Sequence, residues 1–312
     1  MGDAPPMTGH DTHKLSRNIL AALPARYRVD GTKPFHIADH DPEDDGGLGL
    51  DKAQGKALLK LSRKRLSELQ ELLYANGTTS MLIVLQGMDT AGKDGTIKHV
   101  MSGVNPAGVS VSSFKQPGPQ ELLHGFLWRV HIVAPSAGRI GIFNRSQYED
   151  VLVTRVHPEM LEREHLPGAI NTDAFWQGRF EDIRHFEHYL ARQGTVVLKF
   201  FLNISREEQR ERLLARLDDK EKRWKFSTSD VKERQFWDKY QCAYEEAVGH
   251  TSRPYAPWFV VPSNHKWYAR LVVMETIIDA LEALKQKPPV MDPAFATSLD
   301  RYRDELMSEK PD

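Results

Sequence analysis

Residues 87–95 combine glycines, a lysine and two aspartates in a pattern that suits phosphate binding. The segment GMDTAGKDG places Gly87, Gly92 and Lys93 at the spacing G-x-x-x-x-G-K. Glycines let successive backbone N–H groups converge on a phosphate, and a helix that follows adds the positive end of its dipole. Lys93 would supply a mobile positive charge for a transferring phosphate. A plain glycine turn between a strand and a helix is the alternative interpretation.

Two aspartates set this segment apart from an ordinary phosphate loop. Asp94 stands where a Ser or Thr normally holds magnesium, and Asp89 adds a second carboxylate. Carboxylates repel a phosphate unless cations are present, so we expect Mg²⁺ bound by Asp89 and by phosphate oxygens. Mn²⁺ is the alternative ion, and Asp94 is the second candidate ligand. Asp94 has an equally good explanation as a helix-dipole partner in the first turn.

A second group of polar residues follows an apolar run at 139–144. Ser146 and Glu149 have the spacing of a capping box, S-x-x-E, which predicts the start of a helix. Capping fully explains both residues, so the sequence by itself assigns Glu149 no chemical role. Arg145 precedes the cap at the carboxyl end of a predicted strand, where α/β sheets bind ligands. Its guanidinium could bind a phosphate with two hydrogen bonds.

The segment 204–234 is dense in both arginines and acidic residues. A solvated helical face is the simplest interpretation of such a charge run. Arg212 and Arg216 are four residues apart and would share one face of a helix. Arg223 and Lys225 follow in a predicted loop. A mobile segment with several cations is also what a phosphoryl-transfer enzyme needs in order to close over an anionic substrate.

Short apolar runs predict the strands that must position these residues, at 81–86, 139–144, 195–202 and 257–262. Helical periodicity alternates with them, at 51–76, 96–104, 173–192, 205–217 and 265–285. Strands alternating with helices indicate an α/β fold with a parallel sheet. The glycine-rich loop then lies between a strand and a helix, which favours phosphate binding over a plain turn.

Three regions are expected along the chain. Residues 1–50 read as a partly irregular N-terminal arm without a core of its own, and HDPEDDGGLG at 40–49 reads as loop. Residues 51–285 form the α/β core, with a lid at about 204–234. Residues 286–312 read as a C-terminal tail, either a helix or an arm.

Composition excludes several classes of protein. The 312 residues include 42 Lys and Arg against 43 Asp and Glu, a net charge of −1 that predicts no nucleic-acid partner. No apolar run is long enough to span a bilayer, and the N-terminus lacks a secretory signal, so we expect a cytoplasmic protein without a membrane partner. The one cysteine, Cys242, permits no intrachain disulfide and is expected to be a small buried residue.

Several extended motifs together resemble the polyphosphate kinase 2 family across about residues 45–285. They are MLIVLQGMDTAGKDGTIKHVMSGVNP, GIFNRSQYEDVLVTRVHPE, VVLKFFLNISREEQRERLLARL, KRWKFSTSDVKER and APWFVVPSNHKWYARL, in that order. The resemblance implies a P-loop kinase fold, a parallel sheet flanked by helices with a helical lid. It also implies Mg²⁺-dependent transfer of the terminal phosphoryl group of inorganic polyphosphate to AMP, ADP or other purine nucleotides. A homo-oligomer is the family expectation.

The resemblance assigns roles residue by residue. It implies catalytic roles for Asp89, Lys93 and Arg145, with Asp89 as the metal-linked aspartate of the Walker A element. Contacts to the acceptor nucleotide are implied for Asn144, Arg145 and Glu149. Polyphosphate contacts are implied for a larger set from the loop and the lid: Ala91, Gly92, Lys93, Asp94, Gly95, Arg212, Arg216, Arg223 and Lys225.

One departure from the broader family helps to assign the class. Many members have Asp where Asn144 stands and Asn where Glu149 stands, whereas class III members, which act on nucleoside mono- and diphosphates, share the pattern seen here. Because Asn cannot replace a metal-binding carboxylate, Asp89 must carry more of that role. An ATP-dependent nucleoside monophosphate kinase is the alternative enzyme. A protein that binds polyphosphate or nucleotide without chemistry is the alternative from another class.

Overall fold

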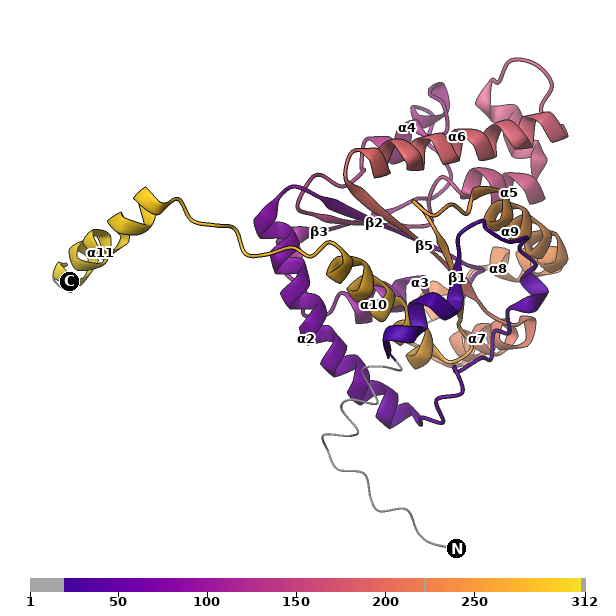
Figure 1. The fold of residues 1–312 in the computed structure, drawn as a ribbon. Coiled ribbons are helices and arrows are strands. Elements are labelled where there is room, and N and C mark those ends of the chain that lie inside the picture. Colours follow the sequence, from indigo (N-terminus) through magenta and orange to yellow (C-terminus); the bar gives the residue numbers. More distant parts are fainter. Residues whose placement is uncertain (1–19, 222, 310–312) are drawn as a thin grey trace, which may run out of the picture.

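The protein is a mixed α/β fold built on a six-stranded sheet flanked by helices (Figure 1). The computed structural model describes residues 20–221 and 223–309. The sheet order is β1-β6-β5-β2-β4-β3, and every neighbouring pair is parallel except β1 with β6. The strands are β1 Arg28–Val29, β2 Ser80–Gln86, β3 Val109–Ser113, β4 Ile140–Asn144, β5 Thr195–Asn203 and β6 Trp258–Pro262.

The four predicted strands are confirmed as β2, β4, β5 and β6. Every residue of β2 is buried, as expected for a continuous apolar run covered on both faces of a parallel sheet. Strands β1 and β3 were not predicted. β3 reads VSVSS and lies at the sheet edge, where its partly exposed serines weaken the apolar signal that identifies a buried strand.

Helices cover both faces of the sheet, with α2, α3 and α10 on one side and α5, α6 and α9 on the other (Figure 1). The predicted helices appear as α2 Lys52–Asn76, α3 Lys93–Val100, α6 Asp173–Arg192, α7 Arg206–Asp218 and α10 Lys266–Ala283. Further α-helices are α4 Trp128–His131, α5 Glu149–Val156, α8 Thr228–Glu233, α9 Trp237–Thr251 and α11 Pro293–Ser308.

Helix α2 shows how the sequence fixes its own ends. The Asp51 side chain accepts hydrogen bonds from the N–H groups of Ala53 and Gln54, which caps the first turn. Gly77 ends the helix in the left-handed region, at φ 60°. Helix α10 packs along α2, and this close contact depends on Gly55, because a Cβ there would lie 2.1 Å from the ring of Trp267.

The two ends of the described chain differ in whether they pack against the body of the protein. Leu20, Leu23, Tyr27 and Phe35 are buried in the main hydrophobic core. Helix α11 stands away from the body of the molecule at the end of an extended segment (Figure 1). No helix among residues 20–221 and 223–309 is long and apolar enough to cross a membrane.

Two predictions about single residues are wrong. Cys242 is exposed rather than buried, because it lies on the outer face of α9 while its neighbours Ala243 and Tyr244 face the core. Ser146 and Glu149 form no capping box. The N-cap of α5 is Tyr148, without a side-chain cap, and the Ser146 hydroxyl accepts from the N–H of Tyr148 and from Gln86 Nε2 instead.

Candidate active site

The glycine-rich loop joins the end of β2 to α3, at the carboxyl edge of the parallel sheet. Gly87 is required by close packing, because a Cβ there would lie 2.9 Å from the Leu202 carbonyl oxygen. Gly92 has φ 108° and serves as the N-cap of α3, a conformation that residues with a side chain rarely adopt. The helix therefore begins at Lys93 and aims its N-terminus into the loop.

Lys93 lies folded back against the loop. Its Nζ donates to the carbonyl oxygens of Gly87 (2.6 Å) and Met88 (3.3 Å). Burial, together with the positive charge of Arg145, lowers the pKa of Lys93 to about 8, against the pull of nearby carboxylates. The hydrogen-bond partners of the Lys93 ammonium are neutral carbonyl groups. A phosphate bound in front of the loop would give it a negatively charged partner.

Arg145 joins two carboxylates of the site. It follows β4 at the same carboxyl edge, with Nη2 3.1 Å from Asp89 Oδ1 and Nη1 3.2 Å from Glu149 Oε2. The Glu149 side chain thus pairs with Arg145 and does not cap the helix. Burial lowers the pKa of Arg145, but Glu149 and Asp89 more than offset this effect and leave it above its ordinary value.

Asn144 and Asp94 lie together on the outer side of the loop. Asn144 Nδ2 donates to Asp94 Oδ1 at 2.8 Å, which links the end of β4 to the first turn of α3. The amide orients this exposed carboxylate without neutralising it. Asp94 therefore remains available both as a partner of the helix dipole and as a candidate cation ligand.

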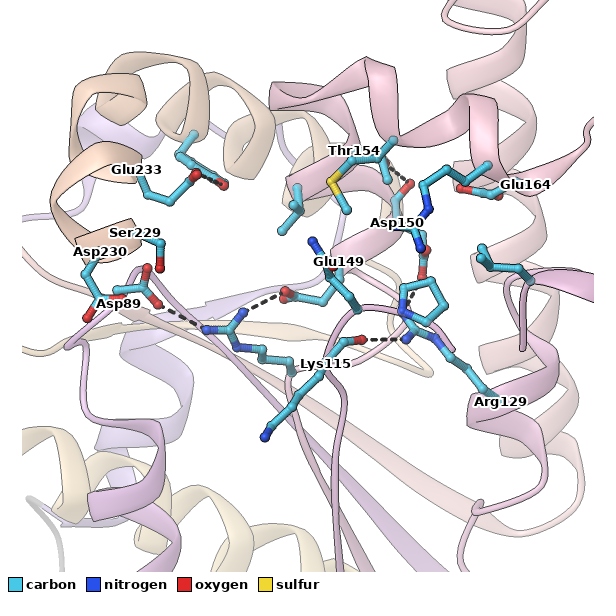
Figure 2. A pocket seen from close by; sticks show the side chains of 18 residues that line it. Asp89, Lys115, Arg129, Glu149, Asp150, Thr154, Glu164, Ser229, Asp230 and Glu233 are labelled. Atoms are coloured by element: carbon cyan, nitrogen blue, oxygen red, sulfur yellow. Dashed lines mark hydrogen bonds and ion pairs between the residues drawn. The ribbon is translucent and has the colours of Figure 1, made fainter. Parts of the chain in front are cut away.

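A cavity of about 280 Å³ opens beside Arg145 (Figure 2). Asp89 and Asp230 lie toward one end of it, and Arg129, Asp150 and Glu164 toward the other (Figure 2). Its wall combines charged groups with the apolar side chains of Pro117, Leu122, Val153 and Met160. Such a mixture is typical of a pocket for an organic ligand.

The far end of the cavity is held by a buried ion pair. Arg129 Nη2 lies 3.2 Å from Asp150 Oδ2, and Arg129 Nη1 donates to the Lys115 carbonyl oxygen at 2.7 Å. Burial raises the pKa of Asp150 to about 6, although Arg129 and Arg179 act in the opposite direction. Arg179 bonds the Asp150 carbonyl oxygen and pairs with Glu164.

Comparison with known proteins decides the family. Residues 49–289, more than three quarters of the chain, match the family model Polyphosphate kinase 2 (PPK2). The chain belongs to the polyphosphate kinase 2 family. It is 48% identical over 251 residues to the ADP-polyphosphate phosphotransferase of Rhodopseudomonas palustris, covering 80% of this chain and 87% of that protein.

Two further relatives support the family. The AMP/ADP-polyphosphate phosphotransferase of Meiothermus ruber is 47% identical over 264 residues, covering 85% of this chain and 95% of that protein. The crystal structure of polyphosphate kinase 2 from Arthrobacter aurescens TC1 superposes with a TM-score of 0.82 at 44% identity. It covers 89% of this chain and 96% of that one.

In this family member the residues predicted for the lid fall into different environments. Arg216 lies 3.3 Å from Asp230 of α8, which lines the cavity. Arg223 is exposed and donates from Nε to the Leu217 carbonyl oxygen at 2.6 Å. The side chain of Lys225 lies outside the described part of the structure. Arg212 is buried behind the glycine-rich loop, and its guanidinium makes five hydrogen bonds within the protein.

Several residues that line the cavity were not predicted. Asp150 lies within the motif GIFNRSQYEDVLVTRVHPE, but nothing in its spacing distinguishes it from a surface residue of α5. Lys115, Arg129 and Glu164 come from segments outside the quoted motifs, whereas Asp230 and Glu233 lie within KRWKFSTSDVKER, where their spacing indicates no role. Only the path of the chain brings these five residues to the cavity.

Proposed function

We propose that this protein transfers the terminal phosphoryl group of inorganic polyphosphate to AMP and ADP, as a class III member of its family with a P-loop kinase fold. The observation that carries the proposal is the position of Arg145, between the phosphate loop and a nucleotide-sized cavity. The printed names of the Rhodopseudomonas and Meiothermus relatives supply the donor and the acceptors.

The arrangement suits an in-line phosphoryl transfer. The acceptor nucleotide occupies the cavity with its phosphates toward Arg145, while the donor chain ends at the loop formed by Ala91, Gly92, Lys93 and Gly95. A phosphate oxygen of the acceptor attacks the terminal phosphorus of the polyphosphate, and the shortened polyphosphate leaves. Lys93 and Arg145 neutralise charge on the transferring group, which is the main catalytic requirement of this reaction.

Asn144 and Glu149 act beside the acceptor in this proposal. Glu149 holds one side of the Arg145 guanidinium, and Asp89 holds the other. An acceptor phosphate that enters takes the place of a carboxylate on Arg145. This exchange leaves Asp89 available for a cation.

The donor set near the loop fits a divalent cation shared with substrate. Among residues 20–221 and 223–309, no group of three or more His, Cys, Asp or Glu side chains is placed to hold a metal ion. Mg²⁺ is commonly held by one or two carboxylates together with substrate phosphates, so Asp89, with Asp94 as second candidate, is a sufficient protein contribution. When bound, Mg²⁺ or Mn²⁺ would neutralise phosphate charge.

The positively charged side chains of the predicted lid bind the part of the polyphosphate chain beyond its reacting end. Arg216, Arg223 and Lys225 lie on α7 and on the segment that follows it. Arg216 is paired with Asp230 in this structure, and a polyphosphate chain would compete for it. Because polyphosphate carries about one charge per phosphate, a row of cations extends its binding beyond the reacting end.

The decisive experiment supplies polyphosphate, Mg²⁺ and either AMP or ADP, with no ATP present. We expect ADP from AMP and ATP from ADP, and no product when the divalent ion is chelated. A protein that forms ADP from AMP only when ATP is the donor is an ATP-dependent nucleoside monophosphate kinase. Binding of both ligands without any product would identify a protein without chemistry.

A further inference from the structure

The carbonyl side of the phosphate loop is fully engaged by side chains. All five carbonyl oxygens of residues 87–91 accept hydrogen bonds from within the protein. Lys93 Nζ donates to the first two, at 2.6 and 3.3 Å. Gln209 Nε2 donates to the third at 3.1 Å, and Arg212 Nη1 donates to the fourth and fifth, both at 3.0 Å. Helix α7 therefore bonds three successive carbonyls of the loop.

Arg212 also reaches the loop after β6. Its Nη2 donates to the carbonyl oxygens of Ser263 (2.5 Å) and Asn264 (3.0 Å), and its Nε to Glu208 Oε1 (2.5 Å). These bonds account for all five N–H groups of a guanidinium. Arg212 is 6% exposed and Gln209 1%. Arg212 thus connects the segments that follow three neighbouring strands, β6, β5 and β2, and Gln209 connects the segments that follow β5 and β2.

A third residue fixes the orientation of Gln209. Arg234 Nη1 donates to Gln209 Oε1 at 3.0 Å and to the Arg206 carbonyl oxygen at 2.6 Å. With its oxygen occupied by Arg234, the Gln209 amide presents Nε2 to the loop. Arg234 lies just after α8, at the end of the predicted lid segment, so this end of the segment also takes part in holding the phosphate loop.

We propose that Arg212, with Gln209, is a positioning residue that holds the phosphate loop by its carbonyl groups, and that it makes no contact with the polyphosphate chain. The C=O and N–H groups of successive peptides in such a loop point to opposite sides, so fixing the carbonyls behind it turns the N–H groups forward. The positive charge of Arg212 behind the loop adds to its attraction for anions. The proposal depends on the proposed function in one respect, namely that phosphate binds at the front of the loop, where its N–H groups point.

Donor length separates positioning from direct contact. Replacing a residue that contacts the chain beyond its reacting end should weaken the binding of long polyphosphate and leave the binding of short donors unchanged. Replacing a residue that shapes the loop should weaken the binding of long and short donors by the same factor. We expect Arg212→Ala to raise the dissociation constants of tripolyphosphate and of a long-chain polyphosphate by the same factor, roughly 100-fold, in calorimetric titrations. Arg212→Lys should recover only part of this loss, because an ammonium group cannot fork between two pairs of carbonyls.

Arg210→Ala is the matched control, since Arg210 carries the same charge on the same helix but is exposed and pairs with Glu207. It should leave both dissociation constants within about twofold. A loss restricted to the long donor, or an equal loss in Arg210→Ala, would overturn the proposal.

Amide hydrogen exchange of the ligand-free protein tests the same idea without any substrate. The N–H of Ala91 donates to the Met88 carbonyl oxygen within the loop, and the N–H of Thr96 donates to the Gly92 carbonyl oxygen in the first turn of α3. Their exchange should accelerate at least tenfold in Arg212→Ala and stay unchanged in Arg210→Ala. Unchanged exchange in Arg212→Ala would refute the positioning role even if polyphosphate is not the natural donor. If Arg212→Ala does not fold, Gln209→Ala replaces it, because that change removes one loop contact and no charge.

Discussion

At the scale of single residues, Arg145 combines backbone strain with electrostatic pairing. Its φ of 64° lies in the left-handed region, which is sparsely populated for residues with a side chain and costs on the order of 1–3 kcal/mol. Thr90 in the phosphate loop has a similar φ of 68°. Arg145 lines the cavity and Thr90 lies within the loop, so both strained residues border the site of the proposed reaction. The pairing of Arg145 with Asp89 and Glu149 holds the guanidinium at that position.

Replacing Asp89 tests the proposed cation ligand. Asp89→Asn keeps the shape of the side chain but removes its charge, so we expect activity to fall by more than about 100-fold with little change in unfolding temperature. Asp300→Asn, on exposed helix α11, is the control and should retain full activity. Turnover of Asp89→Asn within about tenfold of the wild type, a loss of only ~1.4 kcal/mol, would contradict the assignment.

The buried Asp150 predicts a dependence of stability on pH. Burial raises the pKa of Asp150 from 3.8 to about 6, so between these values the folded protein binds a proton that the unfolded chain has released. The stability that this group provides is therefore complete below pH 3.8 and is lost as pH rises through 6.

Urea unfolding at pH 5 and pH 7 measures this effect. The difference in unfolding free energy between wild type and Asp150→Asn should shift by about 1.4 kcal/mol against the wild type over that interval. Asp300→Asn, which changes an exposed carboxylate, should show no such shift. An identical difference at both pH values would mean that Asp150 stays ionised when folded.

At the scale of elements, two of the arginines on α7 have different surroundings. Arg212 faces the phosphate loop and is buried, whereas Arg216, one turn later, pairs with Asp230 of α8 beside the cavity. Burial, and the nearby charge of Asp89, raise the pKa of Asp230. A polyphosphate chain offers Arg216 a more highly charged partner than this carboxylate. Helix α8 is therefore the part of the lid that we expect to respond to substrate.

Removal of Arg216 should affect long donors most. Arg216→Ala is expected to raise KM for long-chain polyphosphate roughly tenfold and to leave KM for ADP unchanged, because one charge-assisted contact with the chain is lost. The effect should shrink as salt is added. Lys232→Ala, an exposed change on α8, serves as the control. An increase in KM for ADP alone would instead place Arg216 beside the acceptor.

At the scale of the whole molecule, the core extends beyond the span that matches the family. The family match begins at residue 49, but Leu23, Tyr27 and Phe35 are buried in the same core. Tyr27 Oη lies 2.7 Å from Tyr268 Oη, and β1 pairs with β6. The described part of the N-terminal arm therefore contributes to global stability. Helix α11 leaves its apolar side chains, such as Phe295 and Leu306, exposed.

A pair of leucines tests this difference. Leu23→Ala should lower the free energy of unfolding by about 2–4 kcal/mol, because it removes a side chain that is buried in the core. Leu306→Ala makes the same chemical change at an exposed position of α11 and should lie within about 0.5 kcal/mol of the wild type. Equal effects in denaturant unfolding would show that the arm does not share the core.

The sequence predicted much of the fold because the relevant signals are local. A buried parallel strand is a short apolar run, and a phosphate loop needs its glycines and lysine within nine residues, so β2, α3 and the loop were predicted together. The signals failed where the neighbours are distant in the chain. The spacing of Ser146 and Glu149 fits a cap, but Arg145 and Gln86 provide stronger partners. Edge strand β3 lacks a continuous apolar run, and its residues are exposed or only partly buried.

By itself, the sequence determined the α/β class and the place of the glycine-rich loop between β2 and α3. The tertiary structure alone decided which way each long charged side chain points. Lys199 lies in the middle of an apolar strand and is buried there, paired with Glu187 at 2.6 Å and hydrogen-bonded to Tyr148 and Thr251. Arg212 and Arg216 look equivalent in the sequence, but one bonds the loop and the other pairs with α8. A guanidinium bonds whatever acceptors the fold places around it, and residue spacing does not encode their positions.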